Sequence, residues 1–254
     1  MSVAGTAERD FDSVLASLEG VEGWLSDDQA RRLWDAAGRV TAPGRIVEIG
    51  SFRGRSTIVL RRAAPEGVEV VAVDPHGGGD RGPQEITPDQ VRGDEDNRVF
   101  NANLTRAGVD GTIRHVRRMS HDALGEVDAP FDVLYVDGAH RYAPARADIE
   151  RWGDRVRTGG TLLVHDSYNA VGVMLAQVRL LFASGRWRYV GRSRSLAEYR
   201  REDLSAAARA TNLLHQLGGV LWFVRNCALK VLLVARQRSL ARRLGLPDGD
   251  DWPY

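Results

Sequence analysis

The sequence is poor in cysteine and has almost no excess of charge. Cys227 is the only cysteine in 254 residues, which excludes an intramolecular disulfide and a zinc site built from several cysteines. This fits the reducing cytoplasm, where we expect the protein to act. The formal net charge is +1, because 35 basic residues are balanced by 34 acidic ones. A dedicated nucleic-acid binder needs a basic excess, so we expect no nucleic-acid partner.

The sequence also lacks long hydrophobic runs. No stretch of about 18 consecutive apolar residues occurs, so we expect no membrane-spanning helix. The first ten residues contain Glu8 and Asp10 and do not match a signal peptide. Lysine is nearly absent, since every basic residue except Lys230 is arginine. Acids are interleaved with these arginines, which indicates a coding bias rather than a set of phosphate clamps.

What the sequence does contain is a regular alternation of short apolar runs and helical patterns. With 43% apolar residues it can bury a sizeable core. Alternating strands and helices predict an α/β fold, specifically a doubly wound, Rossmann-like, mostly parallel seven-stranded sheet with helical N- and C-terminal extensions. We expect N-terminal helices over 1–40, one domain over 41–202 and a helical appendage over 203–254. The predicted strands are 45–50, 68–73, 111–117, 131–136, 161–164, 187–192 and 196–199.

Three local patterns refine this outline. Ser26 followed by Gln29 is a capping-box pattern and predicts a helix start. Residues 76–97 form a long polar stretch, which predicts a mobile lid, and a helix is expected over 97–107. Gly159 and Gly160 predict a turn before the strand 161–164.

A glycine-rich turn after the first strand indicates a nucleoside site. The segment Glu48-Ile-Gly50-Ser51-Phe-Arg-Gly54-Arg-Ser56-Thr57 leads from a strand into a helix, and Asp74 ends the next strand. Glycine permits close backbone approach, and a carboxylate at this place can accept hydrogen bonds from both ribose hydroxyls. Phe52 occupies the position of the second glycine of a dinucleotide fingerprint. A nucleoside without phosphates therefore fits better, and S-adenosylmethionine is the obvious one.

With these residues the chain resembles the class I S-adenosylmethionine-dependent methyltransferases. More narrowly it resembles a bacterial group that includes sugar O-methyltransferases and shares four motifs, present here at 48–57, 73–75, 137–142 and 159–166. The resemblance implies that Gly50, Ser51 and Gly54 lie against the methionine part, Asp74 on the ribose and Ser120 near the adenine. Glu48, Ser56 and Thr57 belong to the first motif and are expected to help bind the cofactor.

Two carboxylates and two histidines follow the later strands. Asp137 and Asp166 each end a strand and are expected to converge beside the methyl donor, where they would suit Mg²⁺. Metal-dependent O-methyltransferases usually place another Asp or Asn after the second aspartate, whereas this chain has Ser167, a weaker ligand. An imidazole is the natural base for a hydroxyl proton near neutral pH. We expect His140 to be that base, with Asp137 and His165 also catalytic or, for His165, near the metal.

The family resemblance points to a sugar, oligosaccharide or glycosylated natural product as the small-molecule acceptor of O-methylation. The appendage leaves more than one interpretation open. Between Arg225 and Arg243 there are six basic residues and no acid. Packing on the domain or on the partner of a homodimer, peripheral contact with an anionic membrane and nucleic-acid contact are all compatible with this pattern. The alternative to an enzyme is a nucleoside-binding, Rossmann-like protein with another or no activity, docked on a membrane by this basic helix.

Overall fold

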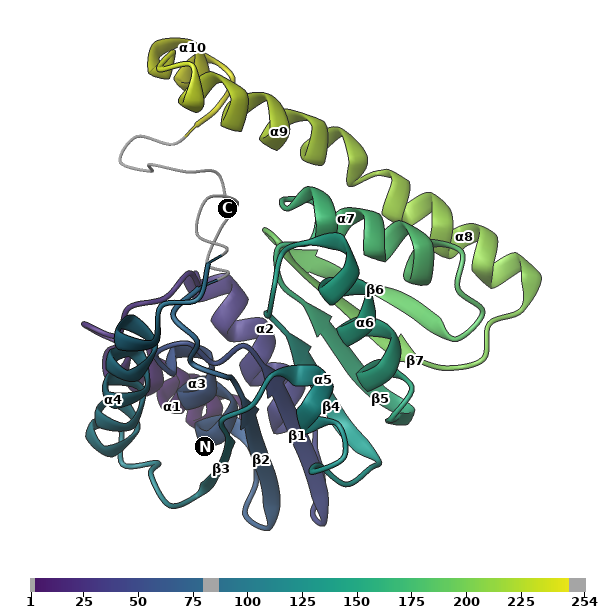
Figure 1. Ribbon diagram of the computed structural model, residues 1–254. Coiled ribbons are helices and arrows are strands. Elements are labelled where there is room, and N and C mark those ends of the chain that lie inside the picture. Colours follow the sequence, from purple (N-terminus) through teal and green to yellow (C-terminus); the bar gives the residue numbers. More distant parts are fainter. Residues whose placement is uncertain (1–2, 80–86, 247–254) are drawn as a thin grey trace.

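The computed structural model describes residues 3–79 and 87–246 and shows a three-layer α/β domain with a long helical appendage (Figure 1). Seven strands form one sheet in the order β3-β2-β1-β4-β5-β7-β6. Five strands are parallel, while β7 runs antiparallel to β5 and to β6. The predicted Rossmann-like fold is thereby confirmed. The strands are β1 Gly44–Ile49, β2 Val68–Val73, β3 Ile113–Val116, β4 Phe131–Val136, β5 Val156–Val164, β6 Trp187–Ser193 and β7 Leu196–Arg201.

Helices cover both faces of the sheet, and alternate residues of each central strand enter the two cores. Val70 of β2 packs with the first four helices, whereas its neighbour Val71 packs on the opposite side with the next three. One layer consists of α1 Val3–Ser17, α2 Asp27–Gly38, α3 Arg55–Ala63 and α4 Gln90–Arg106. The other consists of α5 Ser120–Ala123, α6 Tyr142–Gly153 and α7 Val171–Gln177, which continues as the π-helical turn η1 Val178–Phe182.

The N-terminal helices are part of the domain core. Phe11 and Leu18 of the first helical segment and Leu33 of α2 are buried in the same cluster as Ile46 of β1. The capping box at the start of α2 is confirmed, since the Ser26 backbone N–H donates to Gln29 Oε1 at 2.9 Å.

Two local expectations are wrong. The helix expected from residue 97 begins at Gln90, because Asp89 caps it by accepting from the Arg92 backbone N–H at 3.1 Å. The predicted lid is shorter for this reason, and its central part, 80–86, lies outside the described residues. Gly159 and Gly160 lie inside β5 rather than in a turn before it.

The appendage consists of α8 Ala206–Leu217, α9 Val220–Val234 and α10 Arg238–Arg243. Gly218 and Gly219 separate α8 from α9 but keep right-handed helical angles, with φ of −57° and −80°. The two helices therefore run on nearly in line (Figure 1). Together they give a 29-residue helical segment with a mean hydropathy of 1.6 over 18 residues, long and apolar enough to cross a membrane. The finding rests on length and composition alone, so the expectation of no membrane-spanning helix stays a prediction.

Candidate active site

The candidate site lies at the carboxyl edge of the sheet, where the four singled-out residues end neighbouring strands. The backbone N–H of Gly50 donates to Val73 O at 2.9 Å, and that of Asp137 donates to Ile49 O at 2.8 Å. These bonds join the ends of β1, β2 and β4 at one level. Asp166 follows β5 directly beside them, so ligand-facing groups from four strands meet at one edge, as doubly wound sheets require.

Gly50 allows the loop after β1 to lie against the loop after β4. Its φ is +87°, and a Cβ built there would lie 2.1 Å from the carbonyl oxygen of Asp137. A side chain at position 50 would therefore clash with the backbone of Asp137, whether or not a ligand is bound. Gly54 also has a positive φ, +88°, and its missing Cβ would lie 3.2 Å from the Phe100 ring.

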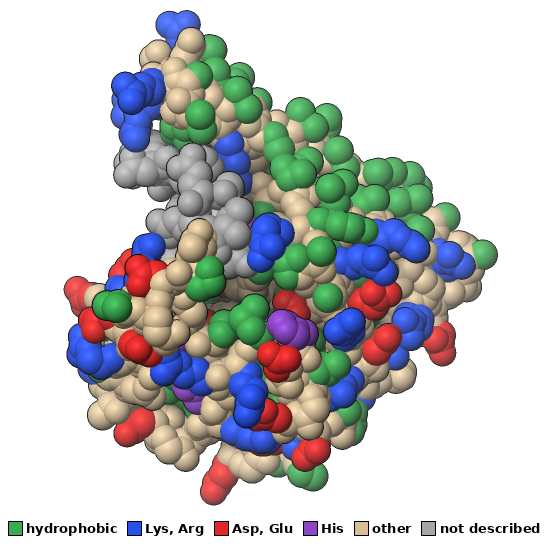
Figure 2. Space-filling model, viewed as in Figure 1, with side chains coloured by type: hydrophobic (Ala, Val, Ile, Leu, Met, Phe, Trp, Pro, Cys, Tyr) green, Lys and Arg blue, Asp and Glu red, His purple; other side chains and the backbone are tan. Residues whose placement is uncertain are grey.

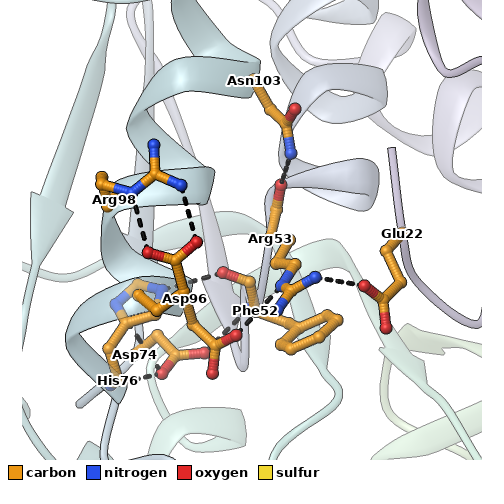
Figure 3. Close-up of polar contacts among 9 residues, drawn as sticks. Glu22, Phe52, Arg53, Asp74, His76, Asp96, Arg98 and Asn103 are labelled. Atoms are coloured by element: carbon orange, nitrogen blue, oxygen red, sulfur yellow. Dashed lines mark hydrogen bonds and ion pairs between the residues drawn. The ribbon is translucent and has the colours of Figure 1, made fainter. Parts of the chain in front are cut away.

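Asp74 ties together two loops of the predicted cofactor site (Figure 3). Its Oδ2 accepts from the Phe52 backbone N–H at 2.8 Å, and its Oδ1 accepts from the His76 backbone N–H at 2.7 Å. The His76 ring completes the contact through Nε2, 2.8 Å from Phe52 O. Each carboxylate oxygen can accept a second hydrogen bond. The side chain remains 15% exposed, as ribose binding requires.

Glu48, Ser56 and Thr57 lie beneath the glycine loop rather than in the cleft. All three are buried, and both hydroxyls donate to the Glu48 carboxylate. Burial raises the pKa of Glu48 to about 8, although the two hydroxyl donors lower it. These residues fix the start of α3 against the end of β1, so their geometry is that of residues supporting the loop from below.

Two serines that were predicted to bind the cofactor lie at the ends of these strands and at the start of α5. Ser51 Oγ is buried and has no hydrogen-bond partner among the described residues, which is unusual for a hydroxyl at a strand end. Ser120, at the start of α5, donates to Asp148 Oδ1 at 2.5 Å. Ser51, Asp74 and Ser120 therefore offer polar groups along one edge of the sheet, and the donor and acceptor set fits a nucleoside.

Asp148 was missed by the sequence reasoning. Burial raises its pKa to about 6, and the hydrogen bond from Ser120 lowers it. The signal was present, because Ala145, Ile149 and Trp152 mark the buried face of α6 and Asp148 lies on the same face. A carboxylate on an apolar helix face needs a partner, and Ser120 is that partner.

Asp137, His140 and Asp166 form a compact cluster after β4 and β5. One ligand atom of each lies within 4.8 Å of the others. His140 Nε2 lies 2.7 Å from Asp166 Oδ2, and His165 Nδ1 lies 3.1 Å from Asp137 Oδ1. The Tyr135 hydroxyl donates to Asp137 Oδ2 at 2.8 Å. The predicted catalytic residues are thus brought together, with Tyr135 as an additional member.

Interactions within this cluster favour the charged forms of His140, His165 and Asp166. Burial by itself lowers the pKa of His140, but the hydrogen bond to Asp166 and the charge of Asp137 outweigh it and raise the pKa. The buried His165 behaves likewise, with its pKa raised by Asp137 and Asp166 against the effect of burial. Burial opposes the charge of Asp166, yet both histidines hold the pKa of its carboxyl well below the ordinary value. His140 is the more exposed imidazole, whereas His165 is almost fully buried.

The donor set of the cluster fits a divalent cation. Asp137 and Asp166 offer carboxylate oxygens, the ligands that Mg²⁺ prefers, and a nitrogen of His140 lies within 4.8 Å of both. Ser167 does not contribute, because its hydroxyl is buried and donates to Val164 O at 2.7 Å. Asn169 holds the Asp166 carboxylate instead, since its Nδ2 donates to Asp166 Oδ1 at 2.8 Å.

The comparisons with known proteins agree with this architecture. Residues 47–167 match the family model described as a methyltransferase domain. A cofactor-bound structure of Rv0187 from MTB is similar with a TM-score of 0.56 and 21% identity, over 77% of this chain and 90% of the other. The O-methyltransferase from Bacillus cereus, in complex with SAH, is similar with a TM-score of 0.54 and 17% identity, over 78% of this chain and 91% of the other. TomG from Streptomyces achromogenes, an O-methyltransferase in complex with SAM, is similar with a TM-score of 0.53 and 20% identity, over 76% of this chain and 89% of the other.

The fold, the strand-end site and the matched domain define the class of this protein. It has the Rossmann-like fold of methyltransferases, and residues 47–167 match a methyltransferase domain.

Proposed function

We propose that this enzyme transfers the methyl group of S-adenosylmethionine to a hydroxyl oxygen of a sugar, an oligosaccharide or a glycosylated natural product. The observation that carries the proposal is the His140–Asp166 pair, 2.7 Å apart, at the carboxyl edge of the sheet. A hydroxyl group loses its proton as it is methylated, so transfer to oxygen requires a nearby proton acceptor. Several similar structures are named O-methyltransferases, which supports oxygen as the acceptor atom.

The His140 ring is held in a defined orientation for this role. Because an ionised carboxylate only accepts hydrogen bonds, Asp166 keeps a proton on Nε2 and leaves Nδ1 as the ring nitrogen that can take the acceptor's proton. His165 and Tyr135 hold Asp137 from behind, so both carboxylates keep fixed positions. S-adenosylmethionine, when bound, supplies an electrophilic methyl group. The protein supplies alignment and one base, and alignment alone accounts for much of the rate of such displacements.

The second part of the proposal concerns a divalent ion, with Mg²⁺ the expected one. Asp137 and Asp166 would hold it, with His140 beside them. Bound Mg²⁺ would orient the acceptor hydroxyl and lower its pKa. The His140 base and the ion act on the same proton, so removing either is expected to slow transfer.

Methyl transfer to a panel of sugar and glycoside acceptors, followed by mass spectrometry of both products, tests the proposal. We expect methyl ethers and an equal amount of S-adenosylhomocysteine. Cofactor binding measured by calorimetry separates a folded, binding-competent enzyme from an inactive one. Methylation of amines or thiols but of no hydroxyl would overturn the choice of oxygen, and turnover only on non-glycosylated phenols would overturn the sugar.

A further inference from the structure

The outer face of α8 and α9 is an exposed apolar band. Every exposed residue from Leu217 through Ala235 is leucine, valine, alanine or glycine. Leu221 is 80% exposed and Val234 is 71% exposed. Figure 2 shows this band as continuous green along the upper right edge of the molecule. Six large side chains form it: Leu214, Leu217, Leu221, Val224, Val231 and Val234.

The inner face of the same helices mixes polar anchors with apolar side chains, since Val220, Trp222 and Phe223 pack on the cluster around Tyr168. Gln216 Nε2 donates to Phe182 O at 3.2 Å, and Lys230 Nζ donates to Asn169 O at 2.8 Å. Asn212 and Asn226 are also buried on this side. A helix on the surface of a water-soluble protein turns its apolar stripe toward the core and polar side chains to solvent, whereas here the exposed face is apolar as well. The outer face is therefore built for an apolar neighbour.

The charge around the band has one sign. Residues 204–246 contain seven basic side chains and no acidic one. Four arginines at the far end, Arg236, Arg238, Arg242 and Arg243, are exposed. Figure 2 shows blue side chains at the tip of the appendage, next to the green band. An apolar helix face with basic residues at its end complements an anionic lipid surface, which attracts basic groups and accepts apolar side chains.

We infer that the outer face of α8 and α9 docks on the surface of an anionic membrane, with the helix lying in the plane of the interface. The preceding helix, α7 with its continuation η1, also exposes large apolar side chains, namely Val171, Leu175 and Val178. A spanning orientation is disfavoured by the inner face. It would break the bonds of Gln216 and Lys230 to the domain and place those groups in hydrocarbon, where each unsatisfied polar group costs several kcal/mol.

A second copy of the chain is the main competing occupant. Leu214, Leu217, Leu221 and Val224 are spaced by three and four residues, as in a coiled-coil seam. Soluble coiled coils flank the seam with paired charges of both signs. Because residues 204–246 contain no acidic residue, two copies of these helices would bring only basic groups together. The pattern therefore favours lipid over a copy of the same chain.

The test uses the full chain and sedimentation with phosphatidylcholine vesicles, with and without phosphatidylglycerol. We expect binding to the anionic vesicles and little binding to the neutral ones. Leu221→Asp combined with Val231→Asp should weaken binding at least about tenfold, and so should Arg236→Glu combined with Arg243→Glu. The matched control is Val91→Asp, which places the same charge on an 82% exposed valine of α4 and should bind like the parent.

Light scattering and cofactor binding complete the test. Unchanged S-adenosylmethionine affinity in the variants shows that the domain remains folded. Equal binding to both vesicle types, or anionic binding that survives the double Asp variant, overturns the inference. A dimer that the double Asp variant dissociates, without any vesicle binding, assigns the face to a second copy instead. Resistance of the membrane-bound protein to alkaline carbonate extraction would overturn the in-plane orientation.

Discussion

Asp166 holds the imidazole of His140 by a contact of 2.7 Å between Oδ2 and Nε2. This contact joins the loop after β4 to the end of β5 and raises the pKa of His140, although burial opposes the shift. The pair therefore fixes both the orientation of the proposed base and the pH at which it becomes active.

His140→Ala should lower kcat by about 10²- to 10⁴-fold, because the acceptor's proton loses its acceptor. Binding of S-adenosylmethionine should stay within error of the parent. In the parent, kcat should rise with pH and reach half its maximum above pH 6.5. The raised pKa keeps His140 protonated, and therefore unable to accept a proton, up to a higher pH. Asp166→Asn should move this midpoint downward. A midpoint that Asp166→Asn leaves unchanged would contradict the assignment of His140 as base.

Asp137→Ala should abolish methyl transfer, because it removes both a cation ligand and the partner of His165. In the parent enzyme, a chelator should slow the reaction and added Mg²⁺ should restore it. Tyr135→Phe keeps the carboxylate but removes its hydroxyl donor, so it should reduce activity only partly. Full activity in chelator would remove the ion from the mechanism, whereas an active Asp137→Ala enzyme would contradict the site itself.

Gly50→Ala should destabilise the fold by at least about 2 kcal/mol, through strain at a positive φ and a clash with the Asp137 carbonyl. Affinity for S-adenosylmethionine should fall with it. Gly125→Ala is the control, since a Cβ there meets no atom within 4 Å and φ is not positive. Chemical denaturation of both variants checks the difference, and equal midpoints would show that the close approach is relieved elsewhere.

Stability should fall as the pH rises from about 4.5 to 8, in part through Glu48. Burial raises the pKa of this carboxyl from 4.5 to about 8, so the unfolded chain releases the proton first. Within that window Glu48 alone lowers the free energy of unfolding by about 1.4 kcal/mol per pH unit. Glu48→Gln should flatten the dependence, whereas exposed Glu66→Gln should leave it as in the parent. Parallel curves for Glu48→Gln and the parent would refute the buried neutral carboxyl.

Ser120→Ala should weaken S-adenosylmethionine binding about five- to tenfold, the effect of one lost hydrogen bond. It also leaves buried Asp148 without its donor. Ser120→Thr retains the hydroxyl and should bind nearly as the parent does. Calorimetry measures both affinities, and an Ala variant as tight as the Thr variant would exclude Ser120 from the adenine site.

Local sequence patterns were sufficient for the fold and for much of the site. Short apolar stretches predicted all seven strands, because strands that are covered by helices consist mainly of apolar residues. Gly50, Asp74, Asp137 and Asp166 could be placed at one edge, because parallel strands end on the same side. The helix before Asn97 was missed, since α4 begins with a polar turn that Asp89 caps.

The sequence by itself therefore determined the class of fold, the order of its motifs and the residue types at the cleft. Only the tertiary structure decided which of the residues at the cleft contact one another. It paired His140 with Asp166 and Ser120 with Asp148, and it placed Glu48, Ser56 and Thr57 beneath the loop. It also revealed that the outer face of the appendage is apolar and exposed. The physical reason is that periodicity records which side of an element is apolar, whereas packing between distant elements decides what that side meets.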